Sequence, residues 1–390
     1  MAFMKMSQAA TMMFGTGSLA VLGDEMKLRG LKKAAIITDK GVTGAGASAQ
    51  VEAVIKEAGF DCMIWDNCLS DPPADSVDEA AAAIRNYGAD TIIGLGGGSS
   101  MDTAKAASMV IKNPISIREI MARPRAPGPL PDPDLPVFTI PTTSGTGSEV
   151  TVVAVLTNPE TSKKGGVAIS GATLAIVDPK LTIGVPPHIT AMTGMDVMAH
   201  SIESITAVPR NPMSDIRGFE ALRLVSAYLP AAVKDGTNIK AREGMSLASS
   251  LAGLAFCDSM TTLAHAVAQA MASVHHLHHG LLCGLATPPE IELFAMAVPE
   301  RIRKIGEIFG AYIPFDATPE EIGLITADKI RAFMNQIGIQ SFAQMGYSRN
   351  DLTDHVDALM YEKMKDLSPC PITEDVAYKI LDRVYDYQGA

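Results

Sequence analysis

The sequence predicts an α/β domain followed by an all-helical domain, and three observations support this assignment. Between residue 30 and about residue 180, short β-rich runs alternate with helical runs, which is typical of a parallel sheet covered by helices on both faces. One β-rich run leads directly into a turn of three glycines, Gly96 to Gly98. After Pro186 and Pro187 the β-branched runs thin out, and Ala, Met and Leu at helical spacing dominate. We therefore expect one domain over residues 1–187 and a second over 188–390.

The elements of the first domain are predicted from runs that glycines and prolines separate. The predicted strands are Ala34–Thr38, Asp61–Trp65, Thr91–Leu95 and Val137–Ile140, and the predicted helices are Ala47–Glu57 and Ser76–Tyr87. Six prolines between Pro124 and Pro136 oppose a regular element there, so we expect an extended surface loop.

The second domain reads as a series of helices joined by short connections. The predicted helices are Thr190–Ser204, Pro212–Ala227, Ala241–Ala255, Leu263–Val274, Pro299–Ile305, Pro319–Met334 and Thr373–Val384. The methionines of this half stand at core positions of the predicted helices, which favours packing over metal ligation.

Length and composition limit the class of protein. A chain of 390 residues exceeds one typical core and fits two domains. The net charge of −11 and the pI near 5.2 argue against a nucleic-acid-binding surface, which needs a concentrated positive field. The five cysteines are scattered and odd in number, as expected for reduced thiols. Because no signal-peptide core and no apolar run of about 20 residues is found, we expect a soluble, cytoplasmic protein without a membrane partner.

The glycine turn predicts a site for a dinucleotide in a Rossmann-like domain. A strand, three glycines and a helix start follow one another from Thr91 to Lys105, so backbone N–H groups at the helix N-terminus could bind a pyrophosphate. The spacing is neither Gly-x-Gly-x-x-Gly nor a P-loop. Asp39, directly after the first strand, could accept from ribose hydroxyls and so favour NAD, or it could cap the next helix. A second turn rich in hydroxyls and glycine, from Pro141 to Val150, offers further donors.

The helical half contains residues with the chemistry and spacing of one divalent-metal site. Asp196 and His200 lie four apart in a helix-compatible run, so their side chains share one face. His265 and His279 would lie about 21 Å apart on a continuous helix, so the chain must turn back between them if both bind one ion. The alternative is a capping Asp and ordinary histidines, but six of the eight histidines fall between positions 200 and 279, which favours the metal.

The donor set also limits the metal. A mixed carboxylate and imidazole set suits Fe(II), Zn(II), Mn(II) or Co(II). Because the set contains no Cys, we do not expect a structural zinc cage.

Four motifs together resemble the iron-containing (group III) alcohol dehydrogenase family. They are Gly96-Gly97-Gly98-Ser99-x-x-Asp102, Pro141-Thr142-Thr143-x-Gly145-Thr146-Gly147-Ser148-Glu149, Gly194-x-Asp196-x-x-x-His200-x-x-Glu203 and His279-Gly280. The resemblance covers essentially the whole chain, in order. It implies a nucleotide-binding α/β domain, an all-helical domain and a bound metal.

The resemblance also implies roles for individual residues. The metal ligands fall on Asp196, His200, His265 and His279, with Fe(II) expected first and Mn(II) or Zn(II) as alternatives. The contacts to NAD(H) fall on Asp39, Gly97, Gly98, Ser99, Thr142, Thr143, Thr146, Lys164 and Leu181.

Two positions depart from the family pattern. Gln269 stands where many members carry a histidine for proton relay, and its amide cannot act as a general base. We therefore expect proton transfer to run through the cofactor ribose and water or through His275. Asp71, before Pro72, stands where an asparagine is common in the family, and we expect it to add a negative charge near the cofactor groove.

We therefore predict an enzyme, an NAD-dependent alcohol dehydrogenase or aldehyde reductase, acting on a small alcohol or aldehyde such as an anionic C2 to C4 aldehyde. We expect a homodimer or larger homo-oligomer. One alternative is a synthase or lyase of the dehydroquinate synthase type, although residues 188–290 are poor in the Lys and Arg that its substrate requires. Another is a catalytically silent protein that binds metal and nucleotide.

Overall fold

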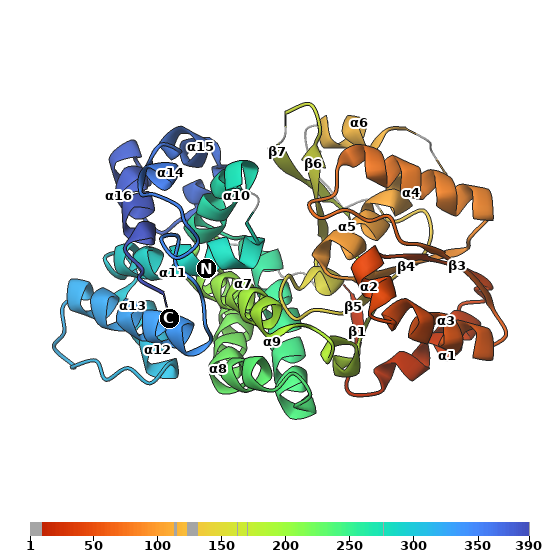
Figure 1. Cartoon of the computed structure of the whole chain (residues 1–390), viewed down its shortest axis with the longest axis horizontal. Coiled ribbons are helices and arrows are strands. Elements are labelled where there is room, and N and C mark those ends of the chain that lie inside the picture. The colour runs from red at the N-terminus through yellow and green to blue at the C-terminus, as the bar shows by residue number, and fades with distance from the viewer. Residues whose placement is uncertain are drawn as a thin grey trace. The chain divides into compact units, whose positions relative to one another are not determined.

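The computed structural model of the chain describes residues 10–112, 115–122, 132–161, 163–169, 171–275 and 277–389 (Figure 1). The chain divides into two compact units, with the boundary between Val185 and Pro186. The first unit is α/β and the second is helical, as the sequence predicts.

The first unit is built on a parallel sheet of six strands. Their order across the sheet is β1-β8-β5-β4-β2-β3. The strands are β1 Thr11–Phe14, β2 Lys33–Ile37, β3 Asp61–Trp65, β4 Thr91–Gly96, β5 Val137–Pro141 and β8 Leu174–Val177. Side chains of β2 alternate between two buried cores, because Ala34 and Ile36 belong to one and Ala35 and Ile37 to the other. Both faces of the sheet are therefore buried, as a parallel sheet requires.

Helices cover the two faces of this sheet (Figure 1). Residues of α1 and α3 fill one core and residues of α4 and α5 fill the other. The helices are α1 Val21–Leu28, α2 Lys40–Gly44, α3 Ala47–Glu57, α4 Ala74–Tyr87, α5 Gly98–Ala107 and α6 Ile117–Ala122. An antiparallel hairpin of β6 Val153–Asn158 and β7 Lys163–Ala168 completes the unit.

The predicted strands and helices of this unit are confirmed to within two residues at each end, whereas β1, β6, β7 and β8 escaped prediction. Lys163–Ala168 contains two lysines and two glycines, a composition depleted in strands, so cross-strand pairing rather than propensity holds it extended. The predicted loop over Pro124 to Pro136 lies mostly outside the described residues, and its described end, residues 132–136, contains no helix or strand.

The described residues of the second unit form helices and connecting segments, without a strand. Its helices are α7 Pro187–Thr206, α8 Pro212–Lys234, α9 Ile239–Ser259, α10 Leu263–His275, α11 His279–Ala295, α12 Pro299–Ile308, α13 Pro319–Gln336, α14 Asn350–Thr353, α15 Val356–Tyr361 and α16 Glu374–Tyr385. The seven predicted helices are confirmed, some with an added turn or more. The structure adds α11, α14 and α15.

Helix α11 escaped prediction because its sequence contains helix breakers. Pro288 and Pro289 lie inside it, and both are buried. Proline in a helix interior costs roughly 3 kcal/mol, so packing on all sides of α11 must offset that cost.

In the described part of the chain, no single helix is long and apolar enough to span a membrane, although α9 and the first ten residues of α10 pass the test as a pair bent by 101°.

Candidate metal centre and nucleotide-binding loops

Helix α7 supplies the first two predicted metal ligands. Asp196 and His200 lie one turn apart, and both are buried. The His200 Nδ1 atom is 3.8 Å from Asp196 Oδ1. The His200 ring stacks on Phe256 of α9, with ring centroids 4.3 Å apart. The predicted shared face of this helix is therefore present.

Helix α10 supplies His265 because the chain bends sharply before it. Met260 ends α9 with a φ of 63°, in the left-handed region that side chains other than glycine rarely adopt. Helix α10 then begins at Leu263, and His265 lies in its first turn with its Nε2 atom 3.6 Å from Asp196 Oδ1.

The chain turns back between the last two predicted ligands, as the metal hypothesis requires. Helix α10 ends at His275 and α11 begins at His279. The His265 and His279 ring centroids are only 5.3 Å apart, and His279 Nε2 is 3.9 Å from Asp196 Oδ1. A continuous helix over this segment is therefore excluded.

Gly280 explains why α11 can lie so close to α7. A Cβ atom at this position would overlap the carbonyl oxygen of Met192 and lie 3.0 Å from the Cβ of Asp196. Only glycine therefore permits the contact that brings His279 to Asp196.

The geometry of this cluster fits a bound cation. Three imidazole nitrogens lie 3.6 to 3.9 Å from one carboxylate oxygen, Asp196 Oδ1. Two ligands bound at about 2.1 Å to a tetrahedral metal are about 3.4 Å apart. Among the described residues, Asp196 Oδ1 and His265 Nε2 are buried and have no hydrogen-bond partner, which is costly unless a ligand satisfies them.

The charges of the cluster favour an ionised carboxylate. Burial alone would raise the pKa of Asp196, but the neighbouring charges of His200, His279 and His265 outweigh that effect and hold the pKa well below its usual range. An acceptor that stays ionised is the form that binds a divalent metal.

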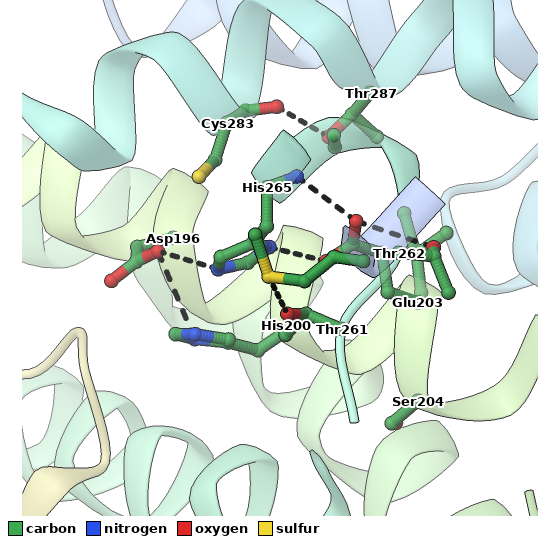
Figure 2. Close-up of polar contacts among 12 residues, drawn as sticks. Asp196, His200, Glu203, Ser204, Thr261, Thr262, His265, Cys283 and Thr287 are labelled. Carbon is green, nitrogen blue, oxygen red and sulfur yellow. Dashed lines mark hydrogen bonds and ion pairs between the residues drawn. The ribbon is translucent and has the colours of Figure 1, made fainter. Parts of the chain in front are cut away.

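Glu203 orients the ring of His265 through the ring nitrogen Nδ1. The backbone N–H of His265 donates to Glu203 Oε1 at 3.0 Å, and its ring Nδ1 is hydrogen-bonded to Glu203 Oε2 (Figure 2). Since an ionised carboxylate can only accept, Nδ1 carries the proton, and the lone pair of Nε2 is left for a cation bound beside Asp196. Burial opposes ionisation of Glu203, but its contacts with His265 lower its pKa.

A second buried carboxyl, Glu290, lies on the far side of Thr262. The Thr262 hydroxyl is 3.0 Å from Glu290 Oε1 and 3.3 Å from Glu203 Oε1, and the N–H of Ala264 donates to Glu290 at 3.1 Å. Burial and the neighbouring charge of Glu203 raise the pKa of Glu290 well above its ordinary value. The sequence analysis missed Glu290, since a Glu directly after two prolines gives no signal of a buried helical position.

Cys283 is the other residue that the sequence analysis missed. Its Sγ atom joins a group with Asp196, His265 and His279 in which all ligand atoms lie within 4.8 Å of one another. Burial raises the pKa of its thiol to about 12. The structure thus adds a thiol beside the ligand set that the sequence analysis described without Cys. The i, i+4 spacing from His279 was the available signal, but it required knowing that a helix begins there.

Gln269 lies one turn after His265 and has a protein partner. Its Nε2 donates to the sulfur of Met364 at 3.9 Å, and Thr261 donates to the same sulfur. The side chain of His275, named as a relay candidate, and the whole of His276 lie outside the described residues.

In the first unit, the glycine turn lies at a topological switch point of the sheet. The chain passes from β2 to β3 on one side and returns to β4 on the other, and ligands of such sheets bind at the carboxyl ends of the strands there. Gly96 has a φ of 144°, and a Cβ there would meet Ser100 at 2.7 Å. Gly97, Gly98 and Ser99 then begin α5.

Asp39 caps a helix at this switch point. Its Oδ1 accepts from the N–H of Val42 at 3.0 Å, and its Oδ2 accepts from the Ser100 hydroxyl at 3.3 Å. Of the two readings open for Asp39 in the sequence, the cap is thus present, and the second oxygen lies beside the glycine turn.

The hydroxyl-rich turn after β5 lies against the glycine turn. The N–H of Thr142 donates to the carbonyl of Gly96 at 3.0 Å. A Cβ on Gly98 would lie 2.9 Å from the Thr146 methyl, and a Cβ on Gly97 would lie 3.6 Å from the Thr143 hydroxyl. The two turns that the sequence assigned to one nucleotide are therefore neighbours.

The remaining predicted nucleotide contacts lie elsewhere in the unit. Lys164 Nζ on β7 is 2.7 Å from Asp71 Oδ1, so these two predicted residues neutralise each other. Asp71 has a φ of 49°, a conformation that asparagine and glycine adopt more readily. Leu181 packs into the hydrophobic core of the sheet.

Asp102 of the family motif belongs to a buried polar cluster. Lys105 is fully buried, and its Nζ is 2.9 Å from Asp102 Oδ1. It also lies 2.7 Å from the Ser148 hydroxyl and 2.7 Å from the carbonyl of Val153. This cluster ties α5 to the hydroxyl-rich turn and to β6.

Comparison with known proteins agrees with this geometry. A model described as iron-containing alcohol dehydrogenase matches residues 9–179, and one described as Fe-containing alcohol dehydrogenase family, C-terminal, matches residues 190–385. The chain is 32% identical to choline dehydrogenase of Bacillus subtilis (strain 168), over 95% of this chain and 91% of that protein. It is 34% identical to NAD-dependent methanol dehydrogenase of Bacillus methanolicus, over 87% and 88%.

A solved structure extends this agreement to three dimensions. Sulfoacetaldehyde reductase from Bifidobacterium kashiwanohense in complex with NAD+ superposes with a TM-score of 0.85 at 30% identity, over 98% of this chain and 99% of that chain. The chain therefore belongs to the iron-containing alcohol dehydrogenase family and is an oxidoreductase that acts on an alcohol or aldehyde with NAD(H) and a metal.

Proposed function

We propose that the protein transfers a hydride reversibly between NAD(H) and a short, neutral alcohol or aldehyde. In this proposal Asp196, His200, His265 and His279 bind one divalent metal, Fe(II) first and Mn(II) or Zn(II) as alternatives. The observation that carries it is the convergence of three imidazole nitrogens on Asp196 Oδ1, with buried acceptor atoms that no hydrogen bond satisfies.

The bound metal supplies Lewis acidity toward the substrate oxygen, and the nicotinamide supplies or accepts the hydride. Glu203 fixes the ring of His265 so that Nε2 points toward Asp196. Phe256 holds the His200 ring by stacking. Gln269 can donate or accept a hydrogen bond but cannot take up the proton, which we assign to a route through the ribose and water.

A neutral substrate is favoured by the positions of the two arginines nearest in sequence to the metal helix. Arg217 donates to Asp258 at 3.2 Å and to the carbonyl of Leu254. Arg210 donates to the carbonyl of Ala207 at 2.9 Å. Both side chains thus serve helix connections, which favours a neutral aldehyde over the anionic one that the sequence left open.

The decisive test is an NADH-oxidation screen over neutral and anionic C2 to C4 aldehydes. The protein is stripped of metal and reloaded separately with Fe(II), Mn(II) and Zn(II), and metal content is measured in parallel. We expect turnover with neutral aldehydes, and we expect Asp196→Ala to lose metal and activity together. The matched control is Asp354→Ala, an exposed aspartate.

Two outcomes would overturn the assignment. An active, metal-free Asp196→Ala protein removes the metal from the mechanism. A metal-loaded wild type that turns over no aldehyde supports the silent-protein alternative.

For the nucleotide, we propose that the charge of Asp39 selects NAD over its 2′-phosphorylated form, alongside the contacts assigned above to the two turns. Asp39→Asn separates this role from the cap, because asparagine caps helices as well as aspartate does. We expect unchanged thermal stability and a smaller preference for NADH over NADPH. An unchanged preference would leave Asp39 with the capping role alone.

We also propose a homodimer or larger homo-oligomer and a cytoplasmic location. The free cysteines Cys62, Cys68, Cys257, Cys283 and Cys370 support a reducing compartment. Light scattering coupled to size exclusion tests the oligomer, and fractionation of the source cells tests the location.

A further inference from the structure

Cys283 lies in the metal cluster although the family's four ligands do not include it. It follows His279 by one turn of α11, and its sulfur is 3.6 Å from His279 Nε2. Figure 2 shows the sulfur directed toward the space beside Asp196 and His265, on the opposite side of these residues from His200 in this view. The ligand atoms of Asp196, His265, His279 and Cys283 all lie within 4.8 Å of one another.

Two further atoms in this space need a positive partner. Asp196 Oδ1 and His265 Nε2 are buried, and neither has a hydrogen-bond partner among the described residues. Cys283 belongs to the hydrophobic core of the helical unit, but its sulfur also lies beside one carboxylate and two imidazoles, which packing alone does not require. Sulfur, oxygen and nitrogen donors together are a typical environment for a transition metal.

We propose that Cys283 is a sulfur ligand of the same metal, an inference that rests on the metal site proposed above. Coordination forms a metal–sulfur bond and releases the thiol proton to solvent, without any oxidant or reductant. Because thiolate is a soft ligand, it favours Zn(II) and Co(II) over Mn(II). In this chain, Cys283 therefore shifts the choice among the metals toward zinc.

Cobalt reports on this bond directly, because a thiolate ligand gives Co(II) an intense near-ultraviolet charge-transfer band that nitrogen and oxygen ligands do not give. Metal-free wild type, Cys283→Ser and Cys283→Ala are each titrated with Co(II), and bound cobalt is counted by mass spectrometry. The control is Cys370→Ser, a half-buried cysteine of the same unit outside the cluster. We expect the band in the wild type and the control and its loss in both Cys283 variants, which still bind cobalt.

A competition experiment measures the consequence for selectivity. We expect the ratio of Zn(II) affinity to Mn(II) affinity to be at least about tenfold smaller in Cys283→Ser than in the wild type. Circular dichroism confirms that both variants are folded, and Cys283→Ala removes any oxygen ligand that serine could supply.

The outcomes separate this inference from the proposed function. If the wild type binds one Co(II) without a charge-transfer band, and Asp196→Ala binds none, the sulfur ligand is overturned and the proposed metal site stands. If Asp196→Ala still binds Co(II) as the wild type does, both the sulfur ligand and the proposed metal site are overturned. A band that persists in Cys283→Ser also overturns the assignment to Cys283.

Discussion

Two buried polar clusters among the described residues, one in each unit, differ in how their hydrogen-bonding atoms are satisfied. In the cluster of Lys105, Asp102 and Ser148, every side-chain polar atom has a partner among the described residues. In the cluster of Asp196 and its histidines, Asp196 Oδ1 and His265 Nε2 have no hydrogen-bond partner among these residues. Complete satisfaction is the mark of a structural network, and incomplete satisfaction at this depth marks a place for a ligand. Buried charge alone therefore does not identify a functional site.

The largest expected effect is on stability at the satisfied cluster. Lys105→Met removes one partner of a buried ion pair and leaves Asp102 uncompensated, which should cost about 3 to 5 kcal/mol of folding free energy. Chemical denaturation measures this cost, and Lys112→Met, at an exposed lysine, is the control. If Lys105→Met has the same denaturation midpoint as the wild type, the network does not stabilise the first unit.

The next effect is at the contact that places His279. Gly280→Ala introduces a methyl group against the Met192 carbonyl and should cost about 1 to 3 kcal/mol through overpacking. Because α11 must move away from α7, we also expect weaker metal binding, measured by competition with a chromophoric chelator. Gly310→Ala, at a helix end with open space around it, should cost stability without changing metal affinity. Equal metal affinities in both variants would refute the role of Gly280.

A smaller effect is expected where Glu203 supports His265. Glu203→Gln keeps the shape but removes the charge that fixes the protonated Nδ1, and it should weaken metal binding about 10- to 100-fold. Glu290→Gln is the matched control, since Glu290 contacts Thr262 and Ala264 rather than a ligand side chain. If both variants bind metal equally well, Glu203 has no orienting role.

The smallest effect is a pH dependence at Glu290. Because burial and then Glu203 raise its pKa above 4.5, its contribution to stability is full below that pH and is lost as pH rises toward the folded-state pKa. Glutamine stays neutral, so the melting temperature of Glu290→Gln should rise relative to that of the wild type as the pH increases above 4.5. The exposed Glu300→Gln serves as the reference. A difference that does not change with pH would contradict a neutral buried carboxyl.

Much of the fold could be predicted from local pattern, and the exceptions have physical causes. Strands β2 to β5 carry β-branched or apolar runs between turns, so propensity and burial agree there. Helix α11 contains Pro288 and Pro289, and strand β7 contains two glycines, so only tertiary contacts make them regular. Helix α8 continues past the predicted end through Pro230 for the same reason.

The candidate site divides in the same way. The sequence by itself determined the ligand types, the pairing of Asp196 with His200 and the need for a reversal before His279, because helical spacing and ion geometry are local rules. Only the tertiary structure decided that Cys283 and Glu290 lie around that site and that Glu203 contacts His265, since these contacts depend on the packing of α7, α10 and α11. Contacts between residues far apart in the chain leave no periodic signal, so the surroundings of the metal ligands could not be read from the sequence.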